Sequence, residues 1–451
     1  MLWPRDEMKA LAEKLLKLVR AEEATVSLAA TQNCNTRFAN NSITTAGLTR
    51  DLSVHLTVTR ERKSGTVTFT ELSDAALARA VRQAEAIAAV TPPNPEYVGP
   101  LGPQDYPEIK AFHEESARAR SADILPAVRT VIEAAEKKKV NSYGYYSVTT
   151  RSEAVANKRG LFGAHHSTWA SYSVTARTPD GTGSGWAAHA SPRLSQMKGS
   201  QVGRIAIRKA VASQQPRKLE PGHYTVILEP AALSGMLLFL AFSFGARAAD
   251  EGRSFLSKRG GGNFVGEKVF GENLSLRSDP FDPRVPGQPW SGELSFFGGG
   301  RGEWLPAQKT VWVENGVVKN LVYDRYWAQR TEKKPTLMPS NLMMDGGTAT
   351  LDDLIASTER GLLVTRFWYI RFLQPQTLQL TGLTRDGLFY IEKGKIQYPV
   401  TNFRFNQSVV NLLNNIEAMT PAVPVGSDYL PAVLPAAKVH TFNFSSVSDA
   451  V

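Results

Sequence analysis

The chain has 451 residues but only one cysteine, Cys34. A single thiol excludes a disulfide framework and any zinc site built from several cysteines. Long apolar runs are also missing, since the longest, residues 233–246, is shorter than the ~20 residues that span a bilayer. Residues 1–20 mix lysine and glutamate with apolar residues and lack the apolar core of a signal peptide. Together these absences predict a cytoplasmic protein that does not enter a membrane.

Histidine is scarce as well, with seven residues in the chain. A hydrolytic zinc site needs three protein ligands, an open position and a base, and no two histidines stand at ligand spacing on one predicted helix. His165 and His166 are neighbours in a predicted strand, so their side chains point to opposite faces. His165 and His189 could meet only through the fold, together with a distant third ligand. We therefore expect this chain to bind no zinc and no other cofactor.

The chain is basic, with a formal net charge of +10 and a pI of about 9.5. Its basic residues are scattered, and the densest run, residues 137–139, stands at the end of a predicted helix, where the helix dipole favours cations. This distribution argues against nucleic-acid binding, which needs a concentrated basic face. Attraction to acidic peptides or to an acidic partner agrees equally well with the charge.

Two stretches of the amino-terminal half follow the same order of elements. The first is predicted to contain a helix at 6–21, strands at 25–28, 36–43, 54–60 and 66–70, and a helix at 73–90. The second is predicted to contain a helix at 123–139, strands at 142–150, 154–158, 165–177 and 185–190, and a helix at 202–213. Residues 91–107 hold six prolines and are predicted to form an extended linker.

Short matches support a duplication of this helix–strands–helix unit. Phe38-Ala39-Asn40 corresponds to Val155-Ala156-Asn157, and Gly65 and Gly181 are predicted turn glycines of the two copies. We therefore predict an α+β fold. Its amino-terminal domain, residues 1–215, consists of two related halves, about 1–90 and 110–215.

Residues 216–451 form a second predicted domain, in which strands dominate. Asn315-Gly316 and Lys393-Gly394 each separate two short strand-like runs, the pattern of a tight hairpin. Helices are predicted only after Pro230, at 351–359 and near 408–417. A domain with this composition is predicted to be β-rich and to curl into a barrel-like body.

One apolar helix, predicted for residues 231–246, is the most informative part of the chain. An extended run and a turn lead through Ser234-Gly235 into it. This frame resembles the zinc-binding segment of the TldD/PmbA metallopeptidase family, whose active subunit carries His-Glu-x-x-x-His on the helix. The resemblance places Phe239 and Phe244 at the two histidines and Leu240 at the glutamate. None of these side chains can bind zinc or accept a proton, so the resemblance implies a degenerate zinc motif.

Further segments of the second domain are similar to the same family in the same order. They are residues 315–324, 339–347, 360–365 and 392–400. The active subunit of the family also takes a zinc ligand from a late cysteine, and this chain has no cysteine after Cys34. Residues 281–284 and 368–371 depart from the family pattern, which puts the family's substrate handling in doubt for this chain.

The resemblance implies a zinc-less, TldE/PmbA-like subunit. It would assemble with a zinc-bearing TldD-like partner, or with itself, into a dimer that acts on unfolded peptides or peptide precursors. Pairing is expected through the second domain, where the following aromatic residues are candidate interface anchors: Trp290, Phe296, Phe297, Trp304, Trp327, Phe367 and Trp368.

Two alternatives remain open. Ser243 lies in Ala-Phe-Ser-Phe-Gly, a loose form of the nucleophile elbow of serine hydrolases, and Asp345 or Asp386 and then His440 follow in the required order. The chain could then be a free-standing hydrolase that uses no zinc. It could also be a homodimeric protein that binds peptides without cleaving them.

Overall fold

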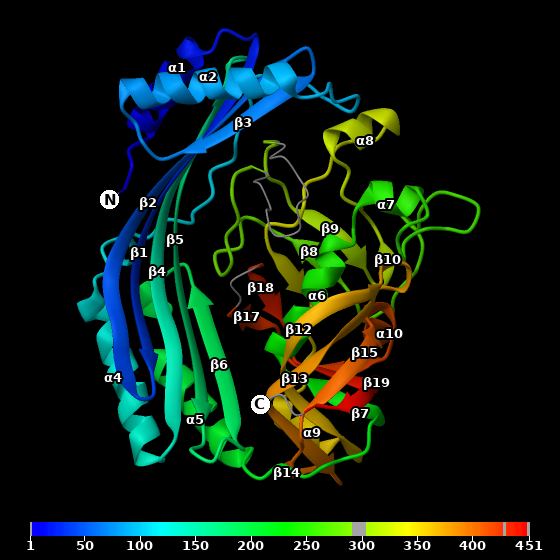
Figure 1. The fold of residues 1–451 in the computed structure, drawn as a ribbon. Helices are drawn as coiled ribbons and strands as arrows, with labels where there is room; N and C mark the ends of the chain where they lie inside the picture. Colours follow the sequence, from blue (N-terminus) through cyan, green and yellow to red (C-terminus); the bar gives the residue numbers. More distant parts are fainter. Residues whose placement is uncertain (1, 291–303, 427–429, 449–451) are drawn as a thin grey trace.

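The computed structural model describes residues 2–290, 304–426 and 430–448. It confirms the predicted α+β class. In Figure 1 a long curved sheet backed by helices stands beside a β-rich body that is formed by the second half of the chain. Among the described residues, no helix is long and apolar enough to cross a membrane.

The amino-terminal half forms one antiparallel six-stranded sheet in the order β3-β2-β1-β4-β5-β6. The two central strands, β1 and β4, pair with each other, so each half of the sheet consists of three consecutive strands. The strands are β1 (Glu23–Ala39), β2 (Ser42–Arg60), β3 (Lys63–Phe69), β4 (Asn141–Asn157), β5 (Phe162–Arg177) and β6 (Ser184–Ser191).

Several of these strands are longer than predicted. The separate strands predicted at 25–28 and 36–43 are wrong, because β1 runs without a break from Glu23 to Ala39, and residues 42 and 43 already belong to β2. The strands predicted at 142–150 and 154–158 are likewise one strand, β4. The polar residues in the middle of β1 do not interrupt it, because β2 and β4 pair with it on both sides.

Four helices cover one face of this sheet, with α1 and α2 at one end and α4 and α5 at the other (Figure 1). They are α1 (Arg5–Leu18), α2 (Asp74–Val90), α4 (Ser121–Lys137) and α5 (Gly199–Ala212), and a short helix α3 (Glu114–Ala117) precedes α4. Apolar side chains such as Leu15, Leu56 and Leu77 fill the first end, and Val131, Tyr172 and Ala206 fill the second. The order helix, three strands, helix therefore occurs twice.

Two glycines mark equivalent points of the two halves. A Cβ on Gly65 would lie 2.0 Å from the carbonyl oxygen of Ala84 in α2, and a Cβ on Gly185 would lie 2.2 Å from that of Ala206 in α5. Gly65 was predicted to be a turn residue, which is wrong, since it lies inside β3. The turn before β3 uses Glu61 and Arg62, both with positive φ, so Gly185 and not Gly181 is the counterpart of Gly65.

The second half contains a closed barrel. Strands β12, β7, β19, β15 and β13 pair in that order, and a further pairing between β12 and β13 closes the ring. This confirms the barrel-like prediction. The strands are β7 (Gly222–Leu228), β12 (Arg360–Gln374), β13 (Gln379–Glu392), β15 (Phe403–Ser408) and β19 (Ala437–Val447), with β14 (Lys395–Pro399) and β16 (Ile416–Met419) attached.

A smaller six-stranded sheet and short helices complete this body. The sheet has the order β10-β9-β8-β11-β18-β17. Its strands are β8 (Leu276–Ser278), β9 (Thr310–Glu314), β10 (Val317–Val318), β11 (Leu342–Met344), β17 (Val423–Val425) and β18 (Ala432–Leu434). The helices are α6 (Pro230–Phe242), α7 (Ala246–Asp250), α8 (Arg325–Arg330), α9 (Leu351–Ala356) and α10 (Val409–Asn414).

The two predicted hairpins of the second half are confirmed. Asn315 and Gly316 both have positive φ between β9 and β10, as do Lys393 and Gly394 between β13 and β14. Two consecutive residues with positive φ form the turn whose twist matches that of paired strands. These turns could be predicted because their geometry depends on the two residues themselves.

Candidate functional site

The amino-terminal sheet with its helices is called the first body below, and the β-rich part that begins at β7 is called the second body. Helix α6 lies in the core of the second body (Figure 1). Pro230 occupies its first turn, where the missing N–H is not needed. Most of the following side chains are buried, including Leu233, Met236 and Leu237. The helix was predicted to reach residue 246, but it ends at Phe242. The Ser243 hydroxyl donates to the Phe239 carbonyl at 2.7 Å, and the chain becomes extended at Gly245.

The three residues at the predicted degenerate motif are all buried. The ring of Phe239 is 6% exposed and packs edge-on against Phe372 at 5.0 Å, and Leu240 is fully buried. Phe244 stacks on Trp312 with ring centres 5.4 Å apart. The prediction that both phenyl rings lie in apolar surroundings is confirmed. Because Phe244 lies beyond the end of the helix, it can face a different neighbour from Phe239.

The groups proposed for a serine hydrolase bond to other residues. Ser243 is engaged by the end of α6, as described above, and Nδ1 of His440 lies 3.1 Å from a carboxylate oxygen of Glu417. Asp386 pairs with Arg366 at 2.5 Å and accepts a hydrogen bond from Ser184, and Asp345 pairs with Arg277. Among the described residues, no hydrogen bond or ion pair joins Ser243 to His440 or to either aspartate.

The described part of the chain contains no cluster of three or more histidine, cysteine, aspartate or glutamate residues that could hold a metal ion. His165 and His189, which could have met through the fold, lie on strands β5 and β6. Burial lowers the pKa of His165 to about 4 and also lowers that of His189. Both are therefore neutral imidazoles at pH 7.

Two cavities lie along the inner face of the amino-terminal sheet. The even-numbered residues of β1, β4 and β5, such as Val26, Val148 and Tyr172, face the helices. Because side chains alternate along a strand, the odd-numbered residues face the second body. Many of these residues are serine or threonine. A cavity of about 360 Å³ lies beside Thr25, Thr57 and other residues of β1 to β3.

The second cavity, of about 470 Å³, lies beside β4 and β5. Its far wall belongs to strands β8 and β9 and to loops of the second body. Sequence reasoning missed both cavities. The sequence indicated only that one face of β4 and β5 is polar, because serine and threonine alternate there with apolar residues. This alternation does not show which part of the chain lies opposite the polar face.

An ion pair holds α6 against the first body. Nζ of Lys209, in α5, lies 2.6 Å from a carboxylate oxygen of Glu229, the residue that precedes α6. Both side chains are mostly buried, with 11% and 18% of their surfaces exposed. The start of α6 is thus tied to a helix of the other body.

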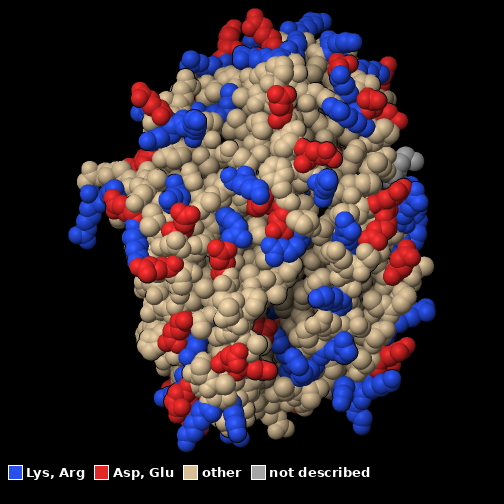
Figure 2. Space-filling model, turned by 180° about the vertical axis from the view of Figure 1, so that it is seen from behind, with Lys and Arg blue, Asp and Glu red and all other residues tan. Residues whose placement is uncertain are grey.

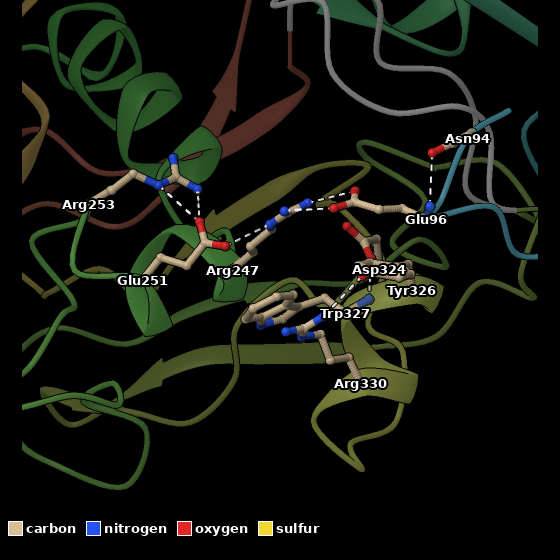
Figure 3. Close-up of polar contacts among 9 residues, drawn as sticks. All are labelled: Asn94, Glu96, Arg247, Glu251, Arg253, Asp324, Tyr326, Trp327 and Arg330. Carbon is tan, nitrogen blue, oxygen red and sulfur yellow. Dashed lines mark hydrogen bonds and ion pairs between the residues drawn. The ribbon is translucent and has the colours of Figure 1, made fainter. Parts of the chain in front are cut away.

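A second joint lies at the opposite end of α6 (Figure 3). The guanidinium of Arg247, in α7, donates two hydrogen bonds of 2.8 Å to the carboxylate of Glu96, in the linker between the sheet halves. The same guanidinium lies 5.3 Å from the ring of Trp327 in α8. The Arg247 hydrogen bonds lower the pKa of the Glu96 carboxyl. Together with the Lys209 pair, this joint fixes the two bodies around the cavities.

The predicted aromatic anchors differ widely in exposure. Trp290, Trp327 and Phe367 are buried, Trp304 is partly buried, and Trp368 is 46% exposed. Phe296 and Phe297 lie outside the described residues. Trp368 is followed by Tyr369, which is 64% exposed. The second half of β12 is therefore the aromatic surface that remains available for an interface.

Charged side chains of both signs are interspersed on the face shown in Figure 2. Many of the basic residues are paired, for example Arg159 with Glu23 at 2.6 Å and Lys268 with Glu272 at 2.6 Å.

Three family models match the chain in succession. They describe the PmbA/TldA metallopeptidase domain 1 at residues 24–88, the central domain at 99–214 and the C-terminal domain at 221–446. The chain belongs to the TldD/PmbA metallopeptidase family. The fold agrees: the chain superposes on the crystal structure of TldE from Thermococcus kodakarensis with a TM-score of 0.84 and 18% identity, covering 97% of this chain and 99% of that one.

Two proteins with similar sequences differ in how much of this chain they match. A protein named metalloprotease PmbA homolog from Haemophilus influenzae is 23% identical over 398 residues, which cover 82% of this chain and 81% of that protein. An uncharacterized protein of Methanocaldococcus jannaschii is 31% identical over 142 residues, 28% of this chain and 30% of that protein. The chain thus spans most of the first relative and less than a third of the second.

Proposed function

We propose that this TldD/PmbA family member is a non-catalytic, TldE-like subunit of a zinc metallopeptidase that acts on unfolded peptides or peptide precursors. The proposal rests on Phe239, Leu240 and Phe244, which the resemblance places at the two zinc-binding histidines and the glutamate of the family. All three are buried apolar side chains in this chain, with Phe239 packed on Phe372 and Phe244 stacked on Trp312. Zinc is expected only in a TldD-like partner.

The cavities along the inner face of the sheet support a role in holding peptides. Serine and threonine hydroxyls line one wall, and they can donate to or accept from a peptide backbone. The chain would then contribute binding surface while its partner supplies zinc. We further propose that it works in the cytoplasm, and that residues 1–215 and 216–451 are its two domains.

Assembly is proposed to use the second domain. The exposed pair Trp368 and Tyr369 on β12 supports this, because large aromatic side chains are frequent interface anchors. The partner is a paralogue that carries His-Glu-x-x-x-His and a late cysteine, or a second copy of this chain where no such paralogue is made.

The test combines elemental analysis with light scattering. The isolated chain is expected to hold no stoichiometric zinc, and mixing it with the zinc-bearing paralogue should give a heterodimer with chelator-sensitive peptidase activity. One tightly held zinc per isolated chain would contradict the proposal. So would a mass that stays near 49.4 kDa when the paralogue is added at micromolar concentration.

The serine-hydrolase alternative predicts activity in the isolated chain that a Ser243→Ala change abolishes. We expect no such activity, because the Ser243 hydroxyl is bonded to the Phe239 carbonyl and His440 to Glu417. Peptide hydrolysis that is resistant to chelators and lost with Ser243→Ala would favour this alternative.

A further inference from the structure

Three tryptophans lie at the cavity beside β4 and β5. Trp169 from β5, Trp290 and Trp312 from β9 all line it. Trp312 is fully buried, and its Nε1 has no hydrogen-bond partner among the described residues. Trp312 is already stacked on Phe244, and Trp290 is only 4% exposed, whereas Trp169 is partly exposed. Trp169 is therefore the indole that a bound group can contact.

A carboxylate lies in the same cavity. Glu153 stands on the inner face of β4 and lines the cavity together with Gln288. The Gln288 amide nitrogen donates to both carboxylate oxygens, at 3.1 and 3.0 Å. The directly opposite residue on β5 is the neutral His165. Within the described residues, no cation lies within 4.0 Å of the Glu153 carboxylate as an ion-pair partner.

The negative charge of the Glu153 carboxylate is only partly compensated by its neighbours. Burial raises the pKa of its carboxyl group, although Arg151 and the Gln288 amide act in the opposite direction. Arg151 stands two residues earlier on the same face of β4, and its side chain is exposed to solvent. A partly compensated carboxylate in a cavity is stabilised when a cation binds beside it.

We propose that this cavity binds a cationic group of a peptide, either a free amino terminus or a lysine or arginine side chain, at the Glu153 carboxylate and the Trp169 indole. An ammonium group supplies the N–H donors that the carboxylate can still accept, and indole faces attract cations. A cavity of about 470 Å³ also admits the flanking backbone. The inference rests on the proposed function in taking a peptide as the ligand.

The experiment measures binding of short synthetic peptides to the full-length chain by calorimetry and by tryptophan fluorescence. The first pair consists of acetylated, amidated alanine pentapeptides with a central lysine or a central norleucine, which differ in charge but little in shape. The second pair contains no lysine and has a free or an acetylated amino terminus. At least one cationic peptide should bind about tenfold more tightly than its neutral counterpart, as expected for an added buried charge contact. The pair that shows the preference identifies the source of the cation.

Two matched variants test the role of the carboxylate. Glu153→Gln keeps the side-chain shape and removes the charge, so the preference for the cationic peptide should disappear. Arg151→Gln, on the same face of the same strand, should keep or increase the preference because it removes a competing cation. Near-ultraviolet circular dichroism and thermal unfolding establish that both variants are folded.

Three outcomes would overturn the inference. Equal binding of cationic and neutral peptides overturns it and leaves the proposed peptide-binding subunit standing. A preference that survives Glu153→Gln assigns the cation to another site. Absence of binding by any peptide also overturns it. In that case the proposed function is tested separately, by the zinc content of the isolated chain and by its pairing with the paralogue.

Discussion

At the scale of single residues, the candidate zinc position is defined by three side chains that cannot coordinate a metal. The residue types could be read from the sequence, and so could their burial, because an apolar segment of this length rarely faces water. Their separate neighbours could not be read, since Phe372 and Trp312 come from strands far along the chain.

Restoring the family's residues should not restore activity. We expect the triple change Phe239→His, Leu240→Glu and Phe244→His to give no chelator-sensitive peptidase activity, because the chain has no late cysteine as a third ligand. It should also lower stability by several kcal/mol, since a glutamate replaces the fully buried Leu240. Peptide hydrolysis with and without chelator, together with thermal unfolding, checks both expectations. Leu240→Met is the volume-matched control and should cost less than about 1.5 kcal/mol.

The buried His165 should make stability depend on pH. Burial lowers its folded pKa from 6.5 to about 4, so the unfolded chain binds a proton that the folded chain does not bind in this range. Stability is then lost as pH falls from about 6.5 to about 4, by roughly 3 kcal/mol.

The variant His165→Gln isolates this effect. Its stability in urea should fall less than that of the wild type between pH 7 and pH 4.5, whereas His223→Gln at an exposed position should follow the wild type. Parallel curves for the wild type and His165→Gln would show that this imidazole does not titrate as described.

At the scale of elements, the two halves of the amino-terminal sheet pack their last helices, α2 and α5, in the same way. Gly65 in β3 and Gly185 in β6 both lie under a helix that approaches so closely that no Cβ fits. The sequence suggested the repeat but paired the wrong glycines, because a glycine required by close packing looks the same in a sequence as one required by a turn.

Alanine at either position should therefore destabilise the chain. A Cβ would meet backbone atoms of α2 or α5 at 2.0 or 2.2 Å, so the helix must shift, at a cost of about 1–3 kcal/mol or more. Gly47→Ala is a matched control in β2, where no atom lies within 4 Å and φ is not positive. Chemical denaturation should give equal loss for the two packed glycines and little change for Gly47. A neutral Gly185→Ala would contradict the proposed equivalence.

At the scale of the whole molecule, polar contacts join the two bodies at several points, among them two ion pairs and the hydrogen bonds of Ser184 to Asp386 and of Gln288 to Glu153. The Lys209–Glu229 pair, at 2.6 Å and mostly buried, links α5 to the start of α6. The Arg247–Glu96 pair lies nearer the surface, with 39% and 38% of the side chains exposed. Removing a partner from the more buried pair should have the larger effect, because it leaves a charge without compensation.

A double-mutant cycle tests this joint. Lys209→Met should lower stability by about 2–4 kcal/mol, since Glu229 is then an unpaired, mostly buried carboxylate. Adding Glu229→Gln should recover part of that loss, which gives a coupling energy above about 0.5 kcal/mol. Limited proteolysis of residues 214–222 should be faster in the single variant. Simple additivity of the two changes would show that the pair does not hold the bodies together.

The sequence by itself determined the features that depend on neighbouring residues. These include the α+β class, the two Asn-Gly and Lys-Gly hairpins, the apolar character of α6 and the lack of zinc ligands on it. The physical reason is that turn geometry, side-chain alternation and ligand chemistry act within a few residues.

Only the tertiary structure decided which polar groups meet and where elements end. Strand β1 continues through a polar stretch because both of its neighbours pair with it. The cavity that joins Glu153 to Gln288 brings together residues separated by 135 positions. Such contacts depend on how the two bodies pack, and no local pattern along a strand or helix records what its exposed face will touch.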